Sequence, residues 1–366
     1  MKVLFESTVY ENPLPQLRAE NSCFPFFCPL PDGTILASHQ MGQAFESVDG
    51  TTFISRSADG GRTWEKPYRA FDKRGETVPL TDCAKLTLLP DGRVLALGYE
   101  FFREDPELPL GNPKTGGLLR DRVYVSFSAD GGRTFSPHRE VPTAWNGHTE
   151  ASAPAVVLQD GSLAAPITGF PDWEGRAVSR NCGRLLRSAD GGETWDDGTV
   201  CMAFPGDAVT CYEQRLCQTG DGTLVVIGWN EDMKTGARLN NHVTISRDNG
   251  KTFSAPIDTG VRGQASSVLA LGGGRVLSLH SVRRDTDEPG ILACVADVSD
   301  GWRVLEQERI WAPRVPVLKS AGMAEIFSFL KFGQPGAALL GDGTVLVSFW
   351  VCEDGVYKTR ALGLSL

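Results

Sequence analysis

Several common sequence features are absent from this chain of 366 residues, and each absence narrows the choice of fold or location. No run of about 18 apolar residues occurs, so we expect no membrane-spanning helix and no membrane partner. The N-terminal MKVLFESTVYENP has neither the charged segment nor the long apolar segment of an export signal, so we expect a cytoplasmic protein. No segment has the apolar period of an amphipathic helix, whereas 41 glycines and 22 prolines separate many short Val, Leu and Ile runs. This pattern predicts an all-β fold.

Basic residues are also scarce relative to acidic ones, and the formal net charge is −9. Because nucleic-acid binding normally needs a basic surface, we expect no nucleic-acid partner, although a few arginines in a pocket still suit a small anionic substrate. The nine cysteines include no C-x-x-C pair, and in a reducing compartment they are expected to be free thiols that mostly fill the core. The five histidines are scattered, and neither an H-E-x-x-H motif nor a phosphate-binding glycine loop is present, so no metal and no cofactor is expected.

What the sequence does contain is a turn motif that recurs at fairly regular intervals. Asp-Gly, or Gly-Gly in one copy, precedes a short apolar run six times, with its first residue at positions 32, 91, 160, 221, 273 and 342. Such dipeptides supply the positive φ angles that a tight antiparallel turn needs. Each copy therefore predicts a β-hairpin.

A second motif, eight residues long, falls between copies of the first. It reads SADGGRTW at 57–64 and recurs at 128–135, at 188–195 and, in a looser form, at 246–253. Its Asp can accept hydrogen bonds from turn amides, and its final Trp or Phe returns to the sheet with a ring to bury. Two hairpins per period give four antiparallel strands, and six periods predict a six-bladed β-propeller.

The two ends of the chain fit the same count. After the sixth Asp-Gly, GTVLVSFW and VYKTRALGLSL supply two strands of the last blade, and the N-terminal MKVLFESTVY is expected to add the fourth strand and close the ring. Blade five lacks the octapeptide, although 291–310 keeps a strand, a turn and Trp302. We expect residues 1–366 to form a single propeller domain.

The octapeptide is similar to the Asp-box, S-x-D-x-G-x-T-W/F, and four of them on a six-period β chain resemble the sialidase, or neuraminidase, superfamily. The resemblance spans essentially the whole chain. It implies that the Asp-box turns lie on the face opposite the active site, so their aspartates have a structural role; these are Asp59, Asp130, Asp190 and Asp248. The superfamily also includes other glycosidases, lyases and non-catalytic propellers, so fold and activity need separate arguments.

Sialidase activity implies a set of residues that can be looked for in this chain. In the superfamily, three arginines hold the substrate carboxylate, a tyrosine is the nucleophile, a glutamate activates it and an aspartate is the acid/base. Glu213 matches the glutamate at the start of blade four. Blade six offers Phe332 and Gln334 where the tyrosine is expected, and Cys23 or Phe24 stands where blade one should supply an arginine.

The remaining positions of this set are filled only in part. Residues 229–231, Trp-Asn-Glu, occupy the place of the second arginine, and Arg283 or Arg284 is left as the third. The acid/base position falls near Glu46 or Asp49. A sialidase without its nucleophile and two of its arginines would lose interactions specific to its transition state. The resemblance therefore supports the superfamily, and the departures indicate a substrate other than that of a typical sialidase.

The residues expected to converge at the propeller axis form the candidate site. They stand near the starts of first strands and the ends of second strands, and they are rich in carboxylates, which raise one another's pKa when they are crowded. The candidate catalytic residues are Glu213, Glu150, Asp82, Glu46 and Asp49. The candidate substrate-binding residues are His39, Lys85, His148, Trp173, Tyr212, Arg215, Asn230, Gln264, His280, Arg283 and Gln334. A set of carboxylates, amides, imidazoles and tryptophan rings suits a carbohydrate pocket.

The leading hypothesis for function is a sialidase-like glycoside hydrolase. It would cleave a small or terminal sugar from a glycan or glycoside, with Glu213 and either Glu150 or Asp82 as acid and base. A carbohydrate is then the expected partner, and the sequence does not determine the oligomeric state.

Two alternatives remain open at this point. The first is a lyase acting on uronic-acid saccharides, in which His148 or His280 and Tyr212 abstract a proton while Arg283 or Arg215 holds the carboxylate. The second is a non-catalytic propeller that binds carbohydrate or protein. A hydrolase, a lyase and a binding protein are separated by their products: a free sugar, an unsaturated sugar, or none.

Overall fold

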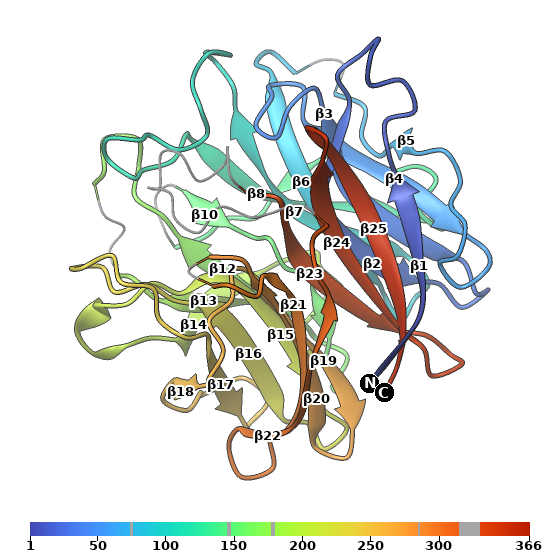
Figure 1. Cartoon of the computed structure of the whole chain (residues 1–366). Coiled ribbons are helices and arrows are strands. Elements are labelled where there is room, and N and C mark those ends of the chain that lie inside the picture. Colours follow the sequence, from blue (N-terminus) through green and yellow to red (C-terminus); the bar gives the residue numbers. More distant parts are fainter. Residues whose placement is uncertain (74–75, 145–147, 177–179, 285, 315–329) are drawn as a thin grey trace.

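Six antiparallel sheets are arranged around a common axis in the computed structural model of the chain (Figure 1). The structure describes residues 1–73, 76–144, 148–176, 180–284, 286–314 and 330–366. Within these residues, the single helical element is a short 3-10 turn, Pro205–Asp207. The fold is therefore all-β, as predicted, and it is a six-bladed propeller with four strands across each blade. No helix in the described part is long and apolar enough to cross a membrane.

The strands follow the order that the two turn motifs predict. Blade one contains β2 (Asn21–Pro29), β3 (Ile35–Gly42), β4 (Thr51–Ser57) and β5 (Tyr68–Arg69). Blade two contains β6 (Leu80–Leu88), β7 (Val94–Phe102), β8 (Asp121–Ser128) and β9 (Arg139–Glu140). Blade three contains β10 (Thr149–Glu150), β11 (Val156–Val157), β12 (Leu163–Gly169), β13 (Gly183–Ser188) and β14 (Asp196–Met202).

The second half of the chain repeats this arrangement. Blade four contains β15 (Tyr212–Gln218), β16 (Leu224–Trp229), β17 (His242–Ser246) and β18 (Ile257–Asp258). Blade five contains β19 (Ser266–Gly272), β20 (Arg275–Val282), β21 (Gly290–Asp297) and β22 (Arg303–Trp311). Blade six contains β23 (Phe332–Leu339), β24 (Val345–Glu353), β25 (Val356–Ser365) and β1 (Lys2–Tyr10).

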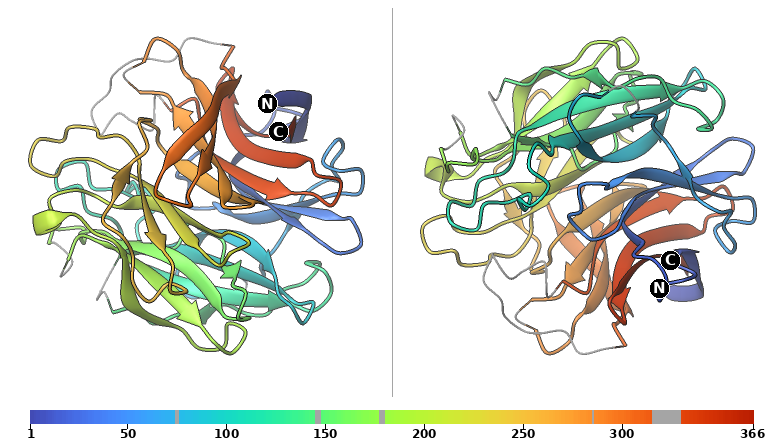
Figure 2. Two further views of the ribbon diagram at one scale, coloured as in Figure 1. Left: turned by 90° about the horizontal axis from the view of Figure 1, so that it is seen from below. Right: turned by 90° about the horizontal axis from the view of Figure 1, so that it is seen from above.

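The N-terminal strand closes the ring. β1 runs antiparallel to β25, from the pair Lys2 and Ser365 to the pair Tyr10 and Thr359. Both views of Figure 2 show the two termini side by side at the edge of the molecule. The predicted closure is confirmed, because the last blade contains one strand from the beginning of the chain and three from its end.

Blade three departs from the regular pattern at its innermost strand. The sequence predicts a continuous strand over 153–158, but only Val156–Val157 of this range pairs with β12, and Thr149–Glu150 pairs with β12 separately. Pro154 lies between the two short strands and has no N–H to donate to the ladder. The inner strand is therefore split into two short strands, and Glu150 is the last residue of the first of them, β10.

The Asp-Gly turns differ in one detail from the prediction. The glycine takes a positive φ, for example 84° at Gly33 and 86° at Gly92, but the aspartate before it does not. Instead, Oδ1 of Asp32 accepts a hydrogen bond from the backbone N of Thr34 at 2.9 Å. A turn in which the aspartate caps the loop and only the glycine is left-handed explains why the dipeptide recurs.

Each Asp-box is a turn held by its own aspartate. In the first, the carboxylate of Asp59 accepts hydrogen bonds from Ser57 Oγ at 2.9 Å, from Thr63 N at 2.9 Å and from Thr63 Oγ1 at 2.6 Å. These donors hold the pKa of Asp59 at about 2. The bond from Thr Oγ1 recurs at 2.6 Å in the other three copies. The aspartates therefore stabilise the turns, as the resemblance implies.

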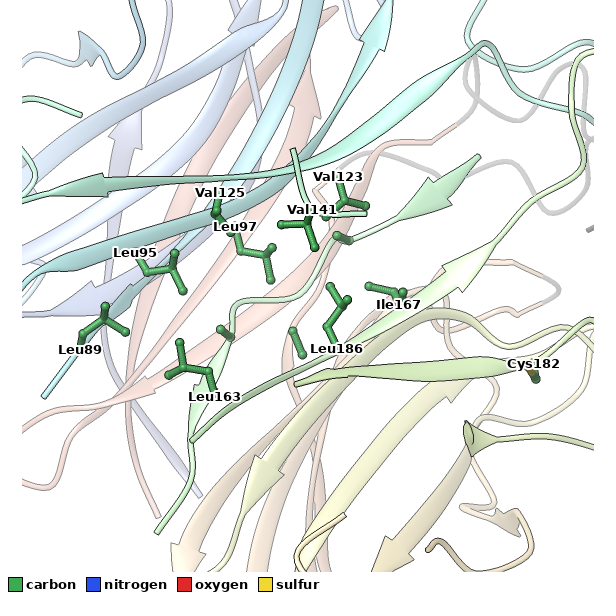
Figure 3. Packing of buried hydrophobic residues seen from close by; sticks show 13 residues of the cluster. Leu89, Leu95, Leu97, Val123, Val125, Val141, Leu163, Ile167, Cys182 and Leu186 are labelled. Atoms are coloured by element: carbon green, nitrogen blue, oxygen red, sulfur yellow. The ribbon is translucent and has the colours of Figure 1, made fainter. Parts of the chain in front are cut away.

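The hydrophobic core lies between neighbouring blades. Figure 3 shows one such layer, where Leu95, Leu97 and Val125 of blade two pack against Leu163 and Leu186 of blade three. All nine cysteines are buried and unpaired, which confirms their predicted role as core residues. Burial of these apolar faces makes the blades a rigid support for the strand ends at the axis.

Candidate active site at the propeller axis

The side chain of Glu213 connects the inner strand of its own blade to the inner strand of another blade. Its Oε2 accepts a hydrogen bond from Trp229 Nε1 at 2.6 Å, and its Oε1 accepts one from Gln334 Nε2. Glu213 lies on β15 of blade four and Gln334 on β23 of blade six. Because blade five separates these two blades along the ring, this contact joins two blades that are not neighbours.

The backbone at this point is unusual in three blades. Glu213, Gln334 and Phe24 have positive φ angles of 43°, 45° and 56°, respectively, although none of them is a glycine. Each lies where its strand shifts register against the second strand of the blade. A left-handed residue in a bulge costs about 1 to 3 kcal/mol, and such strain is concentrated at functional sites because a bulge redirects a side chain.

Glu150 brings a second carboxyl group to Glu213. Its Oε2 accepts a hydrogen bond from the backbone N of Glu213 at 3.3 Å, and the residue is 7% exposed. Burial and the neighbouring charge of Glu213 raise the pKa of Glu150 to about 7, although Ser152 and Arg215 oppose the shift. Glu150 therefore holds a proton at a pH where an ordinary glutamate has lost it. Two carboxyl groups with such different surroundings are typical of an acid and base pair.

Three buried cations surround this pair. Lys85 donates to the carbonyl of Phe24, Arg215 donates to Ser152 Oγ at 2.8 Å, and Arg283 donates to the carbonyl of Phe332. Among the described residues, no carboxylate lies within 4.0 Å of any of the three, although all three are at most 6% exposed. Burial lowers the pKa of Lys85 and lowers that of Arg283 to about 10. Buried cations without a paired anion are costly, so the arrangement suits an anionic ligand.

Aromatic rings line the same end of the inner strands. The ring of Tyr212 stacks on Phe170 at 5.0 Å and lies 4.8 Å from the ring of Trp229. Arg283 lies over the ring of Trp350, 5.7 Å from its centre. Trp229 and Trp350 are buried, whereas Tyr212 and Phe170 are half-buried, and a half-buried aromatic face next to carboxyl groups suits a sugar ring.

Tyr99 is a residue of this region that the sequence analysis missed. Burial and the charges of Glu150 and Glu213 raise its pKa well above the ordinary value. In the register of β6 and β7, Tyr99 pairs with Cys83, and Cys83 Sγ lies 3.3 Å from Lys85 Nζ. Cross-strand partners share a face, so this alternation was the signal that could have identified Tyr99.

Glu100, which directly follows Tyr99, belongs to another environment. Its carboxylate accepts hydrogen bonds from Arg122 and from His138 at 2.9 Å. The ring of His138 stacks on Tyr124 at 3.8 Å. Glu100 is thus paired within blade two, on the face opposite to that of Tyr99.

Asp82 is placed between blades one and two. It is 1% exposed, forms an ion pair with Lys73 and accepts hydrogen bonds from Thr51 Oγ1 at 2.6 Å and from Thr52 N at 3.0 Å. Burial alone would raise the pKa of Asp82, but Lys73 and the threonines lower it. All of these partners bind blade one to blade two, and Asp82 is left out of the function proposed below.

Glu46 and Asp49 lie in the loop between β3 and β4. The carbonyl of Glu46 accepts a hydrogen bond from Arg103 Nη1 at 2.9 Å, and burial raises the pKa of its carboxyl group. Asp49 Oδ1 accepts from the backbone N of Gln43 at 3.1 Å within the same loop. Both residues have partners in the loops of blades one and two, and neither contacts Glu213 or Glu150 in the interactions described.

The predicted histidines occupy two kinds of position. His39 and His280 have no exposed surface, each lies between two serine hydroxyls, and burial lowers the pKa of both to about 3. His148, in contrast, lies 3.5 Å from Asp121, measured from Nδ1 to Oδ1. Burial would lower the pKa of His148, but Asp121 raises it.

The last predicted residues lie in segments that connect strands. The carbonyl of Trp173 accepts hydrogen bonds from Asn112 Nδ2 at 2.9 Å and Thr115 Oγ1 at 2.8 Å, which join the loops of blades two and three. Asn230 Nδ2 donates to the carbonyl of Thr210 at 2.6 Å. Asn230 and Gln264 both border a hollow between blades four and five. No group of three or more His, Cys, Asp or Glu side chains suited to a metal ion occurs in the described residues.

The chain belongs to the family of the BNR repeat-like domain, whose model matches residues 111–307. With six blades around one axis, it is a BNR propeller that shares its fold with sialidases. No curated protein matches the sequence. The described sequence motifs and the fold therefore agree on the family, while the activity has to be argued from the site.

Solved structures with the same fold include a protein of unknown function from Dyadobacter fermentans DSM 18053. It is 19% identical, its TM-score is 0.76, and the match covers 100% of this chain and 99% of that chain. The Hadza microbial sialidase Hz136 is 16% identical with a TM-score of 0.63, covering 94% of this chain and 66% of that one. The Trypanosoma rangeli sialidase in complex with the inhibitor DANA is 15% identical with a TM-score of 0.63, covering 94% and 55%. At these identities the likeness shows the fold alone, and this chain spans only part of the two sialidases.

Proposed function

We propose that this protein is a glycoside hydrolase that removes a terminal, negatively charged sugar from a glycan or glycoside. The observation that carries the proposal is the hydrogen bond from the backbone N of Glu213 to the carboxyl group of Glu150, which brings together two glutamates with different surroundings on the inner strands of blades three and four. Glycoside hydrolysis generally requires one carboxyl group that donates a proton and one carboxylate that acts as base or nucleophile.

The roles of the two residues follow from their surroundings. Glu150, with a pKa of about 7, is the acid that protonates the leaving oxygen. Glu213 is the base or nucleophile, and its carboxylate is held in place by the N–H groups of Trp229 and Gln334. Two fixed donors limit the orientations of the carboxylate, which favours catalysis by positioning.

The preference for an acidic sugar rests on the three buried cations. With Lys85, Arg215 and Arg283 charged and Glu150 neutral, Glu213 offsets one positive charge of three. A carboxylate on the substrate would compensate part of the remaining charge and accept hydrogen bonds from the guanidinium groups. The half-buried ring of Tyr212 supplies apolar surface for the sugar.

The chemistry proposed differs from that of a typical sialidase in its nucleophile. Gln334 stands near the position where the superfamily has tyrosine, and its amide donates to Glu213 instead of presenting a hydroxyl. Phe332 is buried and also lacks a hydroxyl. The proposal therefore assigns bond cleavage to the two glutamates alone.

The test is a panel of chromogenic glycosides that carry glucuronic, galacturonic, sialic or neutral sugars. We expect release of the chromophore from at least one acidic glycoside, and we expect Glu213→Gln and Glu150→Gln each to reduce kcat by about 100-fold or more. Glu193→Gln is the matched control, because Glu193 is exposed in the third Asp-box and pairs with Arg93 and Arg139. Full activity of Glu213→Gln would exclude the proposed mechanism.

A uronate lyase is a second candidate, supported by the same cations and by Tyr212 next to Glu150. Tyr212 has a pKa of about 12, raised by burial and by Glu231 and Glu150. In a lyase the cations would neutralise the uronate carboxylate while a base removes the proton beside it. An ultraviolet-absorbing unsaturated product from an oligouronide would identify this reaction, whereas hydrolysis yields no such absorbance.

A further inference from the structure

Tyr99 lies on the face of blade two that packs against blade three. The ladders that join β7 to β6 and to β8 are regular, so the side chains of Leu95, Leu97 and Tyr99 share one face of the sheet. Leu95 and Leu97 pack against Leu163 of blade three (Figure 3). The side chain of Tyr99 is therefore directed to the same boundary between the two blades, nearer to the end of β7.

A hydrogen bond holds the segment of Glu150 against this face. Asp121 of β8 is paired with Phe101 of β7, so it lies on the same face as Tyr99. The carboxylate of Asp121 accepts hydrogen bonds from the backbone N of Thr149 at 3.1 and 3.0 Å. Glu150 is the next residue, and β10, which contains both, contacts β7 directly. Glu150 and Tyr99 therefore face one another across the boundary between blades two and three.

Tyr99 is more accessible than Glu150. Tyr99 is half-buried, and its hydroxyl makes no hydrogen bond within the described part of the chain, whereas Glu150 is 7% exposed. A tyrosine hydroxyl can accept one proton while it donates its own. Burial and, among the charged groups, first of all Glu150 raise the pKa of Tyr99 well above its ordinary value, while the pKa of Glu150 is about 7. Tyr99 is thus a weak acid by itself, and a proton that it passes on has to be supplied by Glu150.

A second tyrosine near Glu150 has different surroundings. The ring of Tyr212 stacks on Phe170 at 5.0 Å. Burial raises the pKa of Tyr212 to about 12, and the charge of Glu231 contributes more to this rise than that of Glu150 does. Of the two tyrosines, Tyr99 is therefore the one on which Glu150 acts as the foremost charged group.

We propose that Tyr99 is a further catalytic residue, which passes a proton from Glu150 to the leaving oxygen of the substrate. This role rests on the proposed function and deepens it, because Glu150 remains the source of the proton and Glu213 remains the base or nucleophile. A buried acid thereby acts on the substrate through a hydroxyl that is accessible.

The proposed step is balanced in protons and electrons. Glu150 gives its proton to Oη of Tyr99 while the phenolic proton moves to the leaving oxygen. The glycosidic C–O bond breaks and its electron pair stays with that oxygen. Glu213, or a water that Glu213 deprotonates, forms the new bond to the sugar carbon. Tyr99 ends neutral and Glu150 ends as a carboxylate.

The experiment compares full-length wild type and Tyr99→Phe on glycosides of the cleaved acidic sugar with leaving groups of different acidity. Dinitrophenol departs without a proton, whereas methanol has to be protonated as it leaves. We expect kcat/KM of Tyr99→Phe, measured by release of the free sugar, to fall about 100-fold on the methyl glycoside and less than about tenfold on the dinitrophenyl glycoside. Partial unfolding would lower both values equally, and equal losses would overturn the proposal.

Tyr68→Phe is the matched control for removal of a tyrosine hydroxyl. Tyr68 donates to the carbonyl of Gly132 at 2.7 Å, in the second Asp-box, so this variant should equal wild type on both glycosides. Tyr212→Phe tests the other tyrosine near Glu150. A loss that depends on the leaving group in Tyr212→Phe, and none in Tyr99→Phe, would overturn the proposal.

A double variant tests whether Tyr99 and Glu150 act in series. Once Glu150→Gln has removed the source of the proton, Tyr99→Phe should have little further effect on the methyl glycoside. The double variant is therefore expected to lose about as much activity as Glu150→Gln alone. Losses that multiply in the double variant would show that the two residues act independently, which contradicts a relay.

Failure of this proposal is distinguishable from failure of the proposed function. If wild type cleaves both glycosides and Glu150→Gln, but not Tyr99→Phe, loses more activity on the methyl glycoside, the hydrolase assignment stands and the relay is wrong. If wild type cleaves no glycoside, the hydrolase assignment is wrong, and the relay with it.

Discussion

The indole Nε1 of Trp229 donates a hydrogen bond to Oε2 of Glu213 over 2.6 Å. Both residues belong to blade four, Trp229 at the end of β16 and Glu213 near the start of β15. Because Glu213 sits in a bulge with a φ of 43°, this bond and the bond from Gln334 fix a side chain whose backbone is strained. The proposed base is therefore positioned by two groups that do not themselves react.

Trp229→Phe tests this positioning. The change keeps the ring against Tyr212 but removes the N–H, and a hydrogen bond to a charged group contributes about 1.5 to 3 kcal/mol. We expect kcat/KM to fall about 10- to 100-fold, mostly through kcat, with little loss of thermal stability. Trp64→Phe is the control: it removes an indole bond to the carbonyl of Gly61 in an Asp-box, so it should leave kcat/KM unchanged. A loss of activity shared equally by both variants would contradict the positioning role.

The pH dependence of activity should follow Glu150. As an acid it must carry its proton, so activity is expected to decline as the pH rises through about 7, the pKa to which burial and Glu213 raise this residue. The measurement is kcat against pH for wild type on the cleaved glycoside. The range from pH 6 to pH 9 extends about one unit below 7 and about two units above it. A rate that stays constant over this range would exclude Glu150 as the acid.

The same residue should affect stability in the opposite direction to most carboxylates. Its folded-state pKa is above the ordinary value of 4.5, so the folded protein binds the proton more tightly than the unfolded chain. Its contribution to the free energy of unfolding is then largest below about pH 4.5 and declines as the pH rises to about 7. Glu150→Gln, which stays neutral, is expected to flatten this part of the profile measured by thermal unfolding. An identical slope in both proteins would contradict the shift.

A substitution at Gly333 tests the role of Arg283 without removing its charge. A Cβ at residue 333 would lie 2.0 Å from Arg283 Nη1 and 3.1 Å from a ring carbon of Trp350, so Gly333→Ala is expected to displace the guanidinium group. We expect KM for an acidic glycoside to rise about tenfold, while KM for a neutral one is unaffected. Gly341→Ala is the control, because a Cβ there meets no atom within 4 Å. Equal effects on acidic and neutral substrates would show that Arg283 does not bind the substrate carboxylate.

A substitution in an Asp-box tests whether these turns contribute to stability alone or also to activity. Asp130→Ala removes the acceptor of bonds from Ser128 Oγ at 2.7 Å and Thr134 Oγ1 at 2.6 Å, on the face opposite Glu213. The melting temperature is expected to fall by a few degrees because a turn loses its internal bonds. At temperatures well below the transition, kcat/KM should equal that of wild type. Loss of activity in a fully folded Asp130→Ala protein would assign the Asp-box a functional role.

The fold could be predicted from the sequence because its turn motifs depend only on residues that are close together in the chain. All hydrogen bonds that hold the first Asp-box turn through Asp59 come from residues at most four positions away. One octapeptide therefore contains every donor that binds this aspartate. The same holds for Asp32 and Thr34 in the Asp-Gly turns. The Asp-Gly type of turn recurs once per blade, and counting its six copies gives the number of blades. The split of the inner strand at Pro154 was the detail that a count of turns does not reveal.

The site depends on contacts that no local pattern records. Glu213 and Gln334 are 121 residues apart in the chain, and their contact depends on the ring being closed. The bulge at Glu213 also interrupts the alternation of the strand, so the face of each side chain cannot be read from its position. For this reason the sequence identified Glu213 and Glu150 as candidates but did not separate them from Asp82, which binds blade one to blade two. In β7 the alternation is regular, so the face that Tyr99 shares with Cys83 could have been assigned from the sequence.

Pairing of the first strand with the last has a consequence for how the ring can be redesigned. β1 and β25 are neighbours in one sheet, and the two ends of the chain lie side by side (Figure 1). A short linker from Leu366 to Met1 would make this closure covalent, and new ends could be opened at an exposed hairpin such as the one at Asp91. Such a circular permutant keeps every blade and every inner strand while moving the seam of the ring from blade six to blade two.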